Sequence, residues 1–345
     1  MQFIKRIFWN SNQRRLRALW RLIGQLVIFG FLALVVEGSV GVIGLGILVA
    51  REGISPNEFS SPEVVQQVIL KNPTLMMLSY LGLASALTMS IWLAGRLLDR
   101  RLFADFGFHL DRDWWIDFTF GLALGAGLML IIFLGELGAG WVTVTGTFVT
   151  RNPDAGFFSA LLIPLVTFLA VGFYEELFSR GYHLHNLAEG LTWNIISPRG
   201  AIVIATLLSS AVFGVLHASN PNASLFSTLN IGFAGVLLAV GYLLTSELAI
   251  PIALHITWNF FQGNVFGFPV SGTDFRSATF ITIDQGGPDL WTGGAFGPEA
   301  GLVGLGAMAL GILLTVLWVH RRYGEAKLDV SLAEAPTRGQ AVGQP

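Results

Sequence analysis

Residues 161–180 read LLIPLVTFLAVGFYEELFSR, an apolar run that is long enough for a membrane span and is interrupted by two adjacent glutamates. A carboxylate at bilayer depth costs several kcal/mol unless it is paired or hydrated, so ionisable residues inside a span are candidates for function. Glu175 and Glu176, followed by Arg180, are difficult to explain as packing. They indicate a membrane protein with a polar site inside it.

The composition of the whole chain agrees with this interpretation. Of its 345 residues 53% are hydrophobic and 12% are charged, whereas soluble domains carry about 25% charged residues. We therefore predict an all-α polytopic membrane bundle. The net charge of −2 gives no reason to expect nucleic acid as a partner. The absence of cysteine excludes disulfides, thiolate metal sites and cysteine nucleophiles.

Eight segments approach or exceed the about 20 apolar residues that a membrane-spanning helix needs. They lie at about 19–50, 74–97, 114–141, 157–187, 200–218, 223–246, 248–263 and 298–320. We predict one transmembrane helical domain over residues 1–320 and a disordered cytoplasmic tail over 321–345. The loop 264–297 is expected to contain a short strand at Ser277–Ile283. Glycines around Gly121–Gly127 indicate close packing of helices.

The positive charges predict the orientation of the chain. Only Arg51, Lys71, Arg151 and Arg276 fall in loops on one side, and the remaining 16 of the 20 Lys and Arg fall on the other. Because cytoplasmic loops carry the excess of positive charge, both termini are predicted to be cytoplasmic. We expect the membrane to be a bacterial inner (plasma) membrane.

Polar residues recur in the spans of the C-terminal half. They are Glu175-Glu176-x-x-x-Arg180, Phe213-x-x-x-His217, Asn220 with Asn222, and His255-x-x-x-Asn259. Each helical residue turns by about 100°, so Glu175 and Glu176 face different surroundings. Glu176 and Arg180 are four residues apart and can form an ion pair. This pairing makes Glu176 a structural support and leaves Glu175 as the candidate general base.

His255 and Asn259 are also four residues apart, so they project from one helix face and could stabilise an oxyanion. Glu175 and His217 could polarise a water for attack on an amide. Alternatively, Glu175, His217 and His255 could hold a zinc ion. Taken singly, each histidine or asparagine is more often a packing residue, but four such positions in order favour a site. His183 and His185 lie two residues apart and are poor joint metal ligands on a helix.

The three ordered motifs E-E-x-x-x-R, F-x-x-x-H and H-x-x-x-N resemble those of the CPBP family of intramembrane endopeptidases, which includes the type II CAAX prenyl endopeptidases. The resemblance covers about residues 157–263. It implies an α-helical membrane fold of about eight spans that encloses a hydrated cavity. It also implies that Glu175 and His217 activate water, that His255 and Asn259 form the oxyanion hole, and that Glu176 and Arg180 support them.

The resemblance further implies an endopeptidase whose partners are the lipid bilayer and a peptide or protein substrate in or near the membrane. The chain lacks H-E-x-x-H, so we favour a mechanism without a metal cofactor and keep zinc as the alternative. The competing hypothesis is a non-enzymatic membrane protein, such as a bacteriocin-immunity protein, a scaffold or a small-solute carrier.

One geometric difficulty concerns the depths of Glu175 and His217. If their spans start at opposite membrane surfaces near 157 and 201, the two residues lie at about 27 Å and 24 Å along opposite directions, at 1.5 Å per residue. The two residues can meet if the helix at 157–187 begins outside the bilayer, if the helix at 200–218 starts before it enters the bilayer, or if residues 218–223 dip into the membrane.

Overall fold

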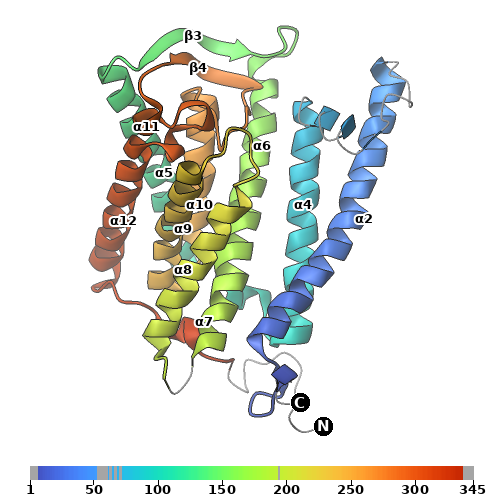
Figure 1. Ribbon diagram of the computed structural model, residues 1–345, viewed down its shortest axis with the longest axis vertical. Helices are drawn as coiled ribbons and strands as arrows, with labels where there is room; N and C mark the ends of the chain where they lie inside the picture. The colour runs from blue at the N-terminus through green and yellow to red at the C-terminus, as the bar shows by residue number, and fades with distance from the viewer. Residues whose placement is uncertain are drawn as a thin grey trace.

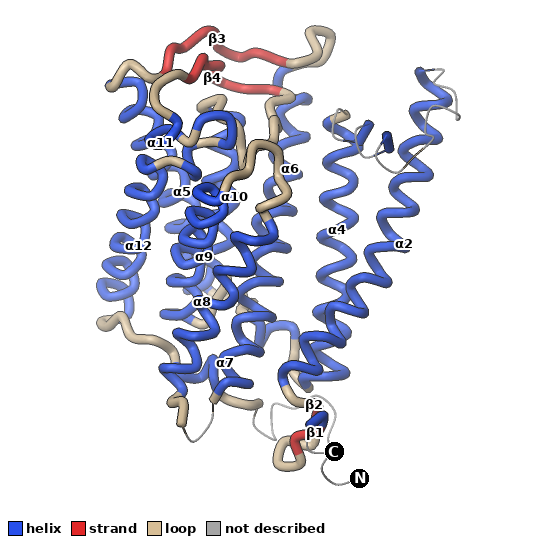
Figure 2. Tube along the Cα trace, in the orientation of Figure 1, coloured by secondary structure: helices blue, strands red, loops and turns tan. Residues whose placement is uncertain are grey.

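The structure is a computed structural model that describes residues 7–52, 61, 64–65, 68–69, 72–192 and 195–336. Long helices stand side by side in a bundle, and a two-stranded sheet lies across one end (Figures 1 and 2). The long helices are α2 (Ala18–Glu52), α4 (Pro73–Ala94), α5 (Arg112–Gly138), α6 (Phe157–Glu176), α8 (Pro198–Leu216), α9 (Leu225–Thr245), α10 (Ala249–Phe260) and α12 (Leu302–Tyr323). This confirms the predicted all-α class.

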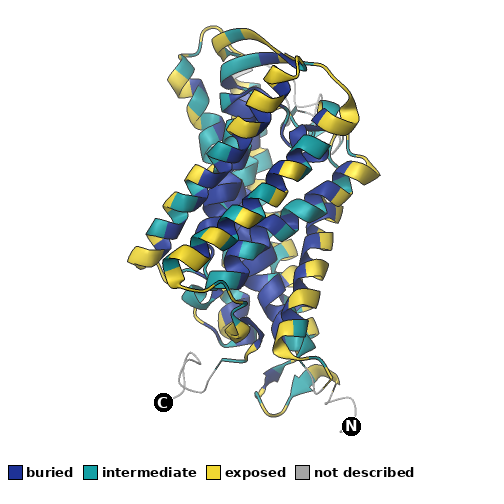
Figure 3. Cartoon of the chain, turned by 90° about the vertical axis from the view of Figure 1, so that its left-hand side faces the viewer, coloured by how far each residue is buried: buried dark blue, intermediate teal, exposed yellow. Residues whose placement is uncertain are grey.

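Seven helical runs in the described part of the chain are long and apolar enough to cross a membrane. Each coincides with a predicted segment, which confirms a polytopic membrane fold. Figure 3 shows the same property from the side: buried residues fill the interior, and exposed ones lie on the outside of the bundle. Several of the exposed residues are large and apolar, including Leu34, Val42 and Leu225. An outer surface of this kind suits contact with lipid tails.

The remaining predicted segment, 248–263, corresponds to α10 and the π-helix η5 (Phe261–Val265) that continues it. With 12 residues, α10 alone is shorter than the about 20 that span a bilayer. It packs against α5, α6 and α9, and most of its residues are buried. A Cβ on Gly125 of α5 would lie 2.5 Å from the carbonyl oxygen of Leu254. The predicted close packing is therefore found here, with α10 as the central helix.

The helix that carries both glutamates does not end at them. α6 runs into the π-helix η4 (Leu177–Leu184) and then into α7 (His185–Leu191), which gives one helical run of 35 residues. At 1.5 Å per residue this run is about 50 Å long, whereas the hydrocarbon core is about 30 Å thick. The run therefore extends beyond the core, and Glu175 lies near its middle. This placement removes the difficulty over depth, because the end of α8 reaches the same level.

Two strands cover one end of the bundle. β4 (Ala278–Gln285) corresponds to the strand predicted at Ser277–Ile283, and it pairs antiparallel with β3 (Val142–Thr150). β3 was not predicted from the sequence. The pairing joins the segment after α5 to the segment before α12, and it contains an irregularity between Val144 and Gly146. Short elements follow at α11 (Asp289–Thr292), η6 (Gly294–Phe296) and η7 (Pro298–Ala300).

The opposite end carries the first and last described segments. These are the strands β1 (Trp9–Asn10) and β2 (Arg15–Leu16) and the 3-10 helix η8 (Val330–Ala333). The π-helix η2 (Gly95–Asp99) and the 3-10 helix η3 (Phe103–Phe106) connect α4 to α5. Buried ion pairs hold this end together: Glu189 contacts Arg15, Arg21 at 2.8 Å and Arg101 at 3.2 Å.

The structure differs from the prediction of a disordered tail over 321–345. Residues 321–323 belong to α12, and the amide of Asp329 donates to the carbonyl oxygen of Leu243 at 2.9 Å. Leu332 is buried in the bundle. This contact was not predicted because the tail is polar overall and contains only a short apolar segment around Leu332. Residues 337–345 lie outside the described residues, so the prediction is untested for them.

Candidate active site

Glu176 sits at the centre of a buried group of charges. Its Oε1 accepts from Arg180 Nη1 at 3.0 Å, and its side chain is 0% exposed. Arg180 also donates to the carbonyl oxygen of Gly235 on α9 at 2.8 Å and lies over the ring of Phe213. The predicted ion pair is therefore confirmed. Because it also reaches α8 and α9, it fixes how these helices pack on α6.

A second contact of Glu176 was not predicted. His255 Nδ1 lies 2.7 Å from the same Oε1. A carboxylate accepts hydrogen bonds, so with Glu176 ionised the proton of this contact is on His255 Nδ1. The other ring nitrogen, Nε2, then carries a proton only when the ring is an imidazolium. Glu176 thus sets the orientation of the His255 ring and fixes which nitrogen carries the proton in the neutral form.

Glu175 faces a different space, as the turn of about 100° per residue requires. Its side chain is 19% exposed, and Oε1 accepts from the hydroxyl of Tyr174 at 3.3 Å. Oε2 has no hydrogen-bond partner among the described residues. It lies 4.0 Å from His217 Nε2 and 4.0 Å from His255 Nε2. One carboxylate oxygen therefore faces both histidines across a gap.

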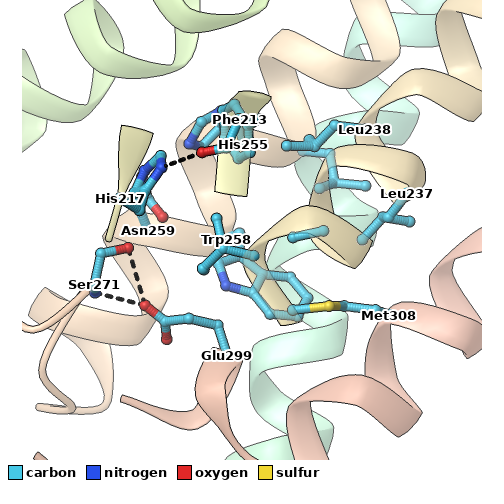
Figure 4. Close-up of a pocket in the computed structure, with 13 residues that line it drawn as sticks. Phe213, His217, Leu237, Leu238, His255, Trp258, Asn259, Ser271, Glu299 and Met308 are labelled. Carbon is cyan, nitrogen blue, oxygen red and sulfur yellow. Dashed lines mark hydrogen bonds between the residues drawn. The ribbon is translucent and has the colours of Figure 1, made fainter. Parts of the chain in front are cut away.

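His217 follows the last residue of α8, and its ring orientation is set locally. Its Nδ1 lies 2.8 Å from the carbonyl oxygen of Phe213, four residues earlier, as Figure 4 shows. Since a carbonyl can only accept, Nδ1 carries the proton. In the neutral ring, Nε2 is then an acceptor that faces Glu175. The spacing of the F-x-x-x-H motif suits this bond to the backbone, and the aromatic ring of Phe213 packs beside the His217 ring.

Glu175, His217 and His255 line a cavity of about 490 Å³ together with Asn259 and Asn220. The rest of the lining is largely apolar and comes from α2, α4, α6, η4, α8 and the segment after η5; it includes Phe29, Leu83, Phe168, Phe178, Leu216, Val270 and Phe275. The structure therefore brings Glu175, His217, His255 and Asn259 together at one cavity. Asn222, by contrast, is exposed and donates to Ala295 at 3.5 Å.

Two features of the site were missed in the sequence. Tyr174 is next to Glu175 and donates to it. Glu299, in η7 just before α12, is 3% exposed and lines a smaller chamber of about 40 Å³ beside His217, His255 and Asn259. The signal for Glu299 was available, because it is a carboxylate inside the predicted span 298–320.

The metal alternative was tested against the donor groups. In the part of the chain that the structure describes, no three His, Asp or Glu side chains are placed to hold a metal ion. His183 lies 3.2 Å from Gln25 and His185 lies 3.1 Å from Tyr242, so these two histidines face different helices. We therefore derive no step through a metal.

Glu299 should make folding stability depend on pH. Burial raises the pKa of Glu299 from 4.5 to about 7. The native state therefore binds a proton that the unfolded chain has released, and stability falls as the pH rises from about 4.5 to about 7. Thermal unfolding in detergent between pH 5 and pH 7.5 measures this decline. The decline should be smaller in Glu299→Gln, and equal declines in both proteins would contradict the assignment.

The comparisons with known proteins agree with the geometry. Residues 157–261 match the family described as Rce1-like, type II CAAX prenyl endopeptidase Rce1-like. The matched segment contains Glu175, Glu176, Arg180, His217, His255 and Asn259. Searches of curated proteins and of solved structures gave no match. Residues 157–261, about a third of the chain, are therefore similar to the Rce1-like family, which supports the resemblance to the CPBP family and, at a coarse level, to a CAAX-type intramembrane protease.

Proposed function

We propose that this protein is an intramembrane endopeptidase that hydrolyses a peptide bond of a membrane-associated or hydrophobic peptide. The observation that carries the proposal is the position of Glu175 Oε2, without a hydrogen-bond partner among the described residues and 4.0 Å from two histidine nitrogens. The largely apolar lining of the cavity suits a hydrophobic substrate.

Glu175 and His217 are placed to activate one water. Since the two acceptors are 4.0 Å apart, a water about 2.8 Å from each would have them about 90° apart, so that each O–H bond can point roughly toward one acceptor. It would then donate one hydrogen to Glu175 Oε2 and one to His217 Nε2, which leaves an oxygen lone pair for attack. As the C–O bond forms, a proton passes to Glu175, and the substrate carbonyl oxygen becomes an oxyanion. When the C–N bond breaks, that proton goes to the leaving amine.

His255 and Asn259 complete the proposed site. Asn259 can donate from its side-chain amide to the oxyanion. His255 can donate from Nε2 when both ring nitrogens carry a proton, and Glu176 Oε1 accepts from its Nδ1 at 2.7 Å. Preorganised donors of this kind lower the barrier most when they need no rearrangement. Glu176 and Arg180 serve this step as the supports that hold His255 in place.

The cellular arrangement is part of the proposal. We place both termini in the cytoplasm of a bacterial cell and the bundle in its inner membrane, because the predicted spans assign 16 of the 20 Lys and Arg to one side. We also propose that residues 1–320 form one transmembrane domain.

A comparison of cells tests the function before any substrate has been identified. Membrane proteomes of cells that express the wild type or Glu175→Gln at equal levels are compared for peptides that extend across a cleavage site. Uncleaved precursors should accumulate in the variant. Equal peptide patterns, together with an intact cellular function in the variant, would favour a non-enzymatic role such as immunity or transport.

Metal dependence has a separate test. Because the proposed mechanism uses side-chain groups of the protein and no metal, purified protein dialysed against a strong chelator should keep its cleavage rate within about twofold, well short of the effect of losing a catalytic base. Metal analysis of the same sample provides the control. Loss of activity that zinc restores would replace this mechanism with one based on zinc.

A further inference from the structure

A tight turn beyond the family-matched segment forms one wall of the cavity. Val270 and Thr273 exchange two backbone hydrogen bonds, of 3.0 Å and 2.9 Å. The two residues between them, Ser271 and Gly272, have φ values of +47° and +77°, which suits a two-residue hairpin turn. Val270, Ser271 and Thr273 all line the cavity of Glu175 and His217. We call Val270–Thr273 the cavity hairpin.

The cavity hairpin is enclosed on several sides. The amide of Gly272 donates to the carbonyl oxygen of Phe296 at 2.7 Å, and Asn220 Nδ2 donates to the carbonyl oxygen of Ser271 at 3.0 Å. A Cβ on Gly272 would lie 1.7 Å from the carbonyl oxygen of Pro221. The turn therefore depends on glycine at this position and has little room to shift.

Glu299 connects the hairpin to the helix of the proposed oxyanion donors. Its Oε1 accepts from the amide of Ser271 at 2.5 Å and from the Ser271 hydroxyl at 3.2 Å, as Figure 4 shows. Its Oε2 accepts from Gln262 Nε2. Gln262 is in η5, which continues the helix that carries His255 and Asn259. A single buried carboxylate thus joins two walls of the cavity.

We propose that Glu299 is a positioning residue that holds the cavity hairpin against the end of α10, so that the hairpin limits which apolar side chains of the substrate fit beside Glu175 and His217. Val270 packs with Phe168, Phe275 and Met76, which is why the selected side chain is apolar. The positioning of the hairpin stands on geometry alone, whereas the selection of substrate rests on the proposed function.

The chain has no cysteine, so Thr273→Cys supplies a single thiol on the hairpin. Its rate of labelling by a water-soluble maleimide, in purified full-length protein in detergent, reports how often the hairpin opens. Loss of hydrogen bonds to a buried carboxylate should raise this rate about tenfold in Glu299→Ala. Glu299→Gln should raise it less, because the amide keeps the size of the side chain.

Glu136→Ala is the matched control. Glu136 is also buried, and it binds Gln285 of β4 at 2.8 Å without lining the cavity, so the labelling rate should not change. Gly272→Ala should raise the labelling rate of the thiol without altering Glu299. It replaces Glu299→Ala as the test of an opened hairpin if Glu299→Ala does not fold. Unchanged labelling in Glu299→Gln alongside increased labelling in Gly272→Ala would overturn the role of Glu299.

The selection of substrate by the cavity hairpin is tested by a separate measurement. On a precursor that the wild type cleaves, Glu299→Gln should cut at additional bonds, which mass spectrometry of the products identifies. A purely structural role would slow every cut equally, and that result would overturn the selection of substrate. If the wild type cleaves nothing, the proposed function fails while the labelling result still decides the positioning role.

Discussion

Glu175→Gln is expected to reduce the rate of peptide-bond cleavage by about 10²–10⁴-fold, the range that a positioned general base contributes. The amide keeps the shape of the side chain but cannot take a proton from water. In the wild type, Glu175 Oε2 has no hydrogen-bond partner among the described residues and lies 4.0 Å from both histidines, so the substitution breaks no hydrogen bond of this oxygen. Initial rates with purified protein and a precursor that accumulates in cells measure the effect.

Glu136→Gln is the control for this experiment. It makes the same chemical change in a buried glutamate of α5 that binds Gln285, away from the cavity, and it should keep the wild-type rate. His217→Ala should lose activity as Glu175→Gln does, since both acceptors hold the same water. Wild-type rates in Glu175→Gln would show that another group is the base.

Arg180→Met is expected to destabilise the protein by about 3–5 kcal/mol, because it leaves the carboxylate of Glu176 buried without its main counter-charge. The side chains of this pair are 1% and 0% exposed, so water cannot replace the lost partner. Equilibrium unfolding in detergent, at increasing concentrations of a chemical denaturant, gives the change in the free energy of unfolding.

The double variant Glu176→Gln with Arg180→Met separates charge from packing. It removes both charges, so much of the stability should return. Its activity should stay low, because His255 loses the carboxylate that accepts from Nδ1. A stability for Arg180→Met equal to that of the wild type would contradict the buried ion pair.

The parts of the site that follow from helix geometry were predictable. Glu176 and Arg180 are four residues apart, so their ion pair depends on a single helix. The separate surroundings of Glu175 follow from the same geometry. The long apolar segments were equally clear, because each contains its own signal of length and composition.

Contacts between distant segments could not be predicted in this way. The bond between His255 and Glu176 depends on how α10 packs against α6, and no spacing in the sequence encodes that. The pairing of β3 with β4 could not be predicted because β4 lies more than a hundred residues later, although the β-branched residues of β3 are themselves typical of a strand. Glu299 could have been identified from the sequence. An ionisable residue inside a membrane span is a candidate for function, and Glu299 lies inside the predicted span 298–320.

Cleavage by the purified protein tests the central claim most directly. Wild-type protein in proteoliposomes is given a precursor that accumulates in Glu175→Gln cells, in water enriched in ¹⁸O, and the products are analysed by mass spectrometry. We predict hydrolysis of a peptide bond, with one ¹⁸O in the new carboxyl group, and no product from Glu175→Gln. The same product at the same rate from Glu175→Gln, or an intact precursor with the wild type, would contradict the account.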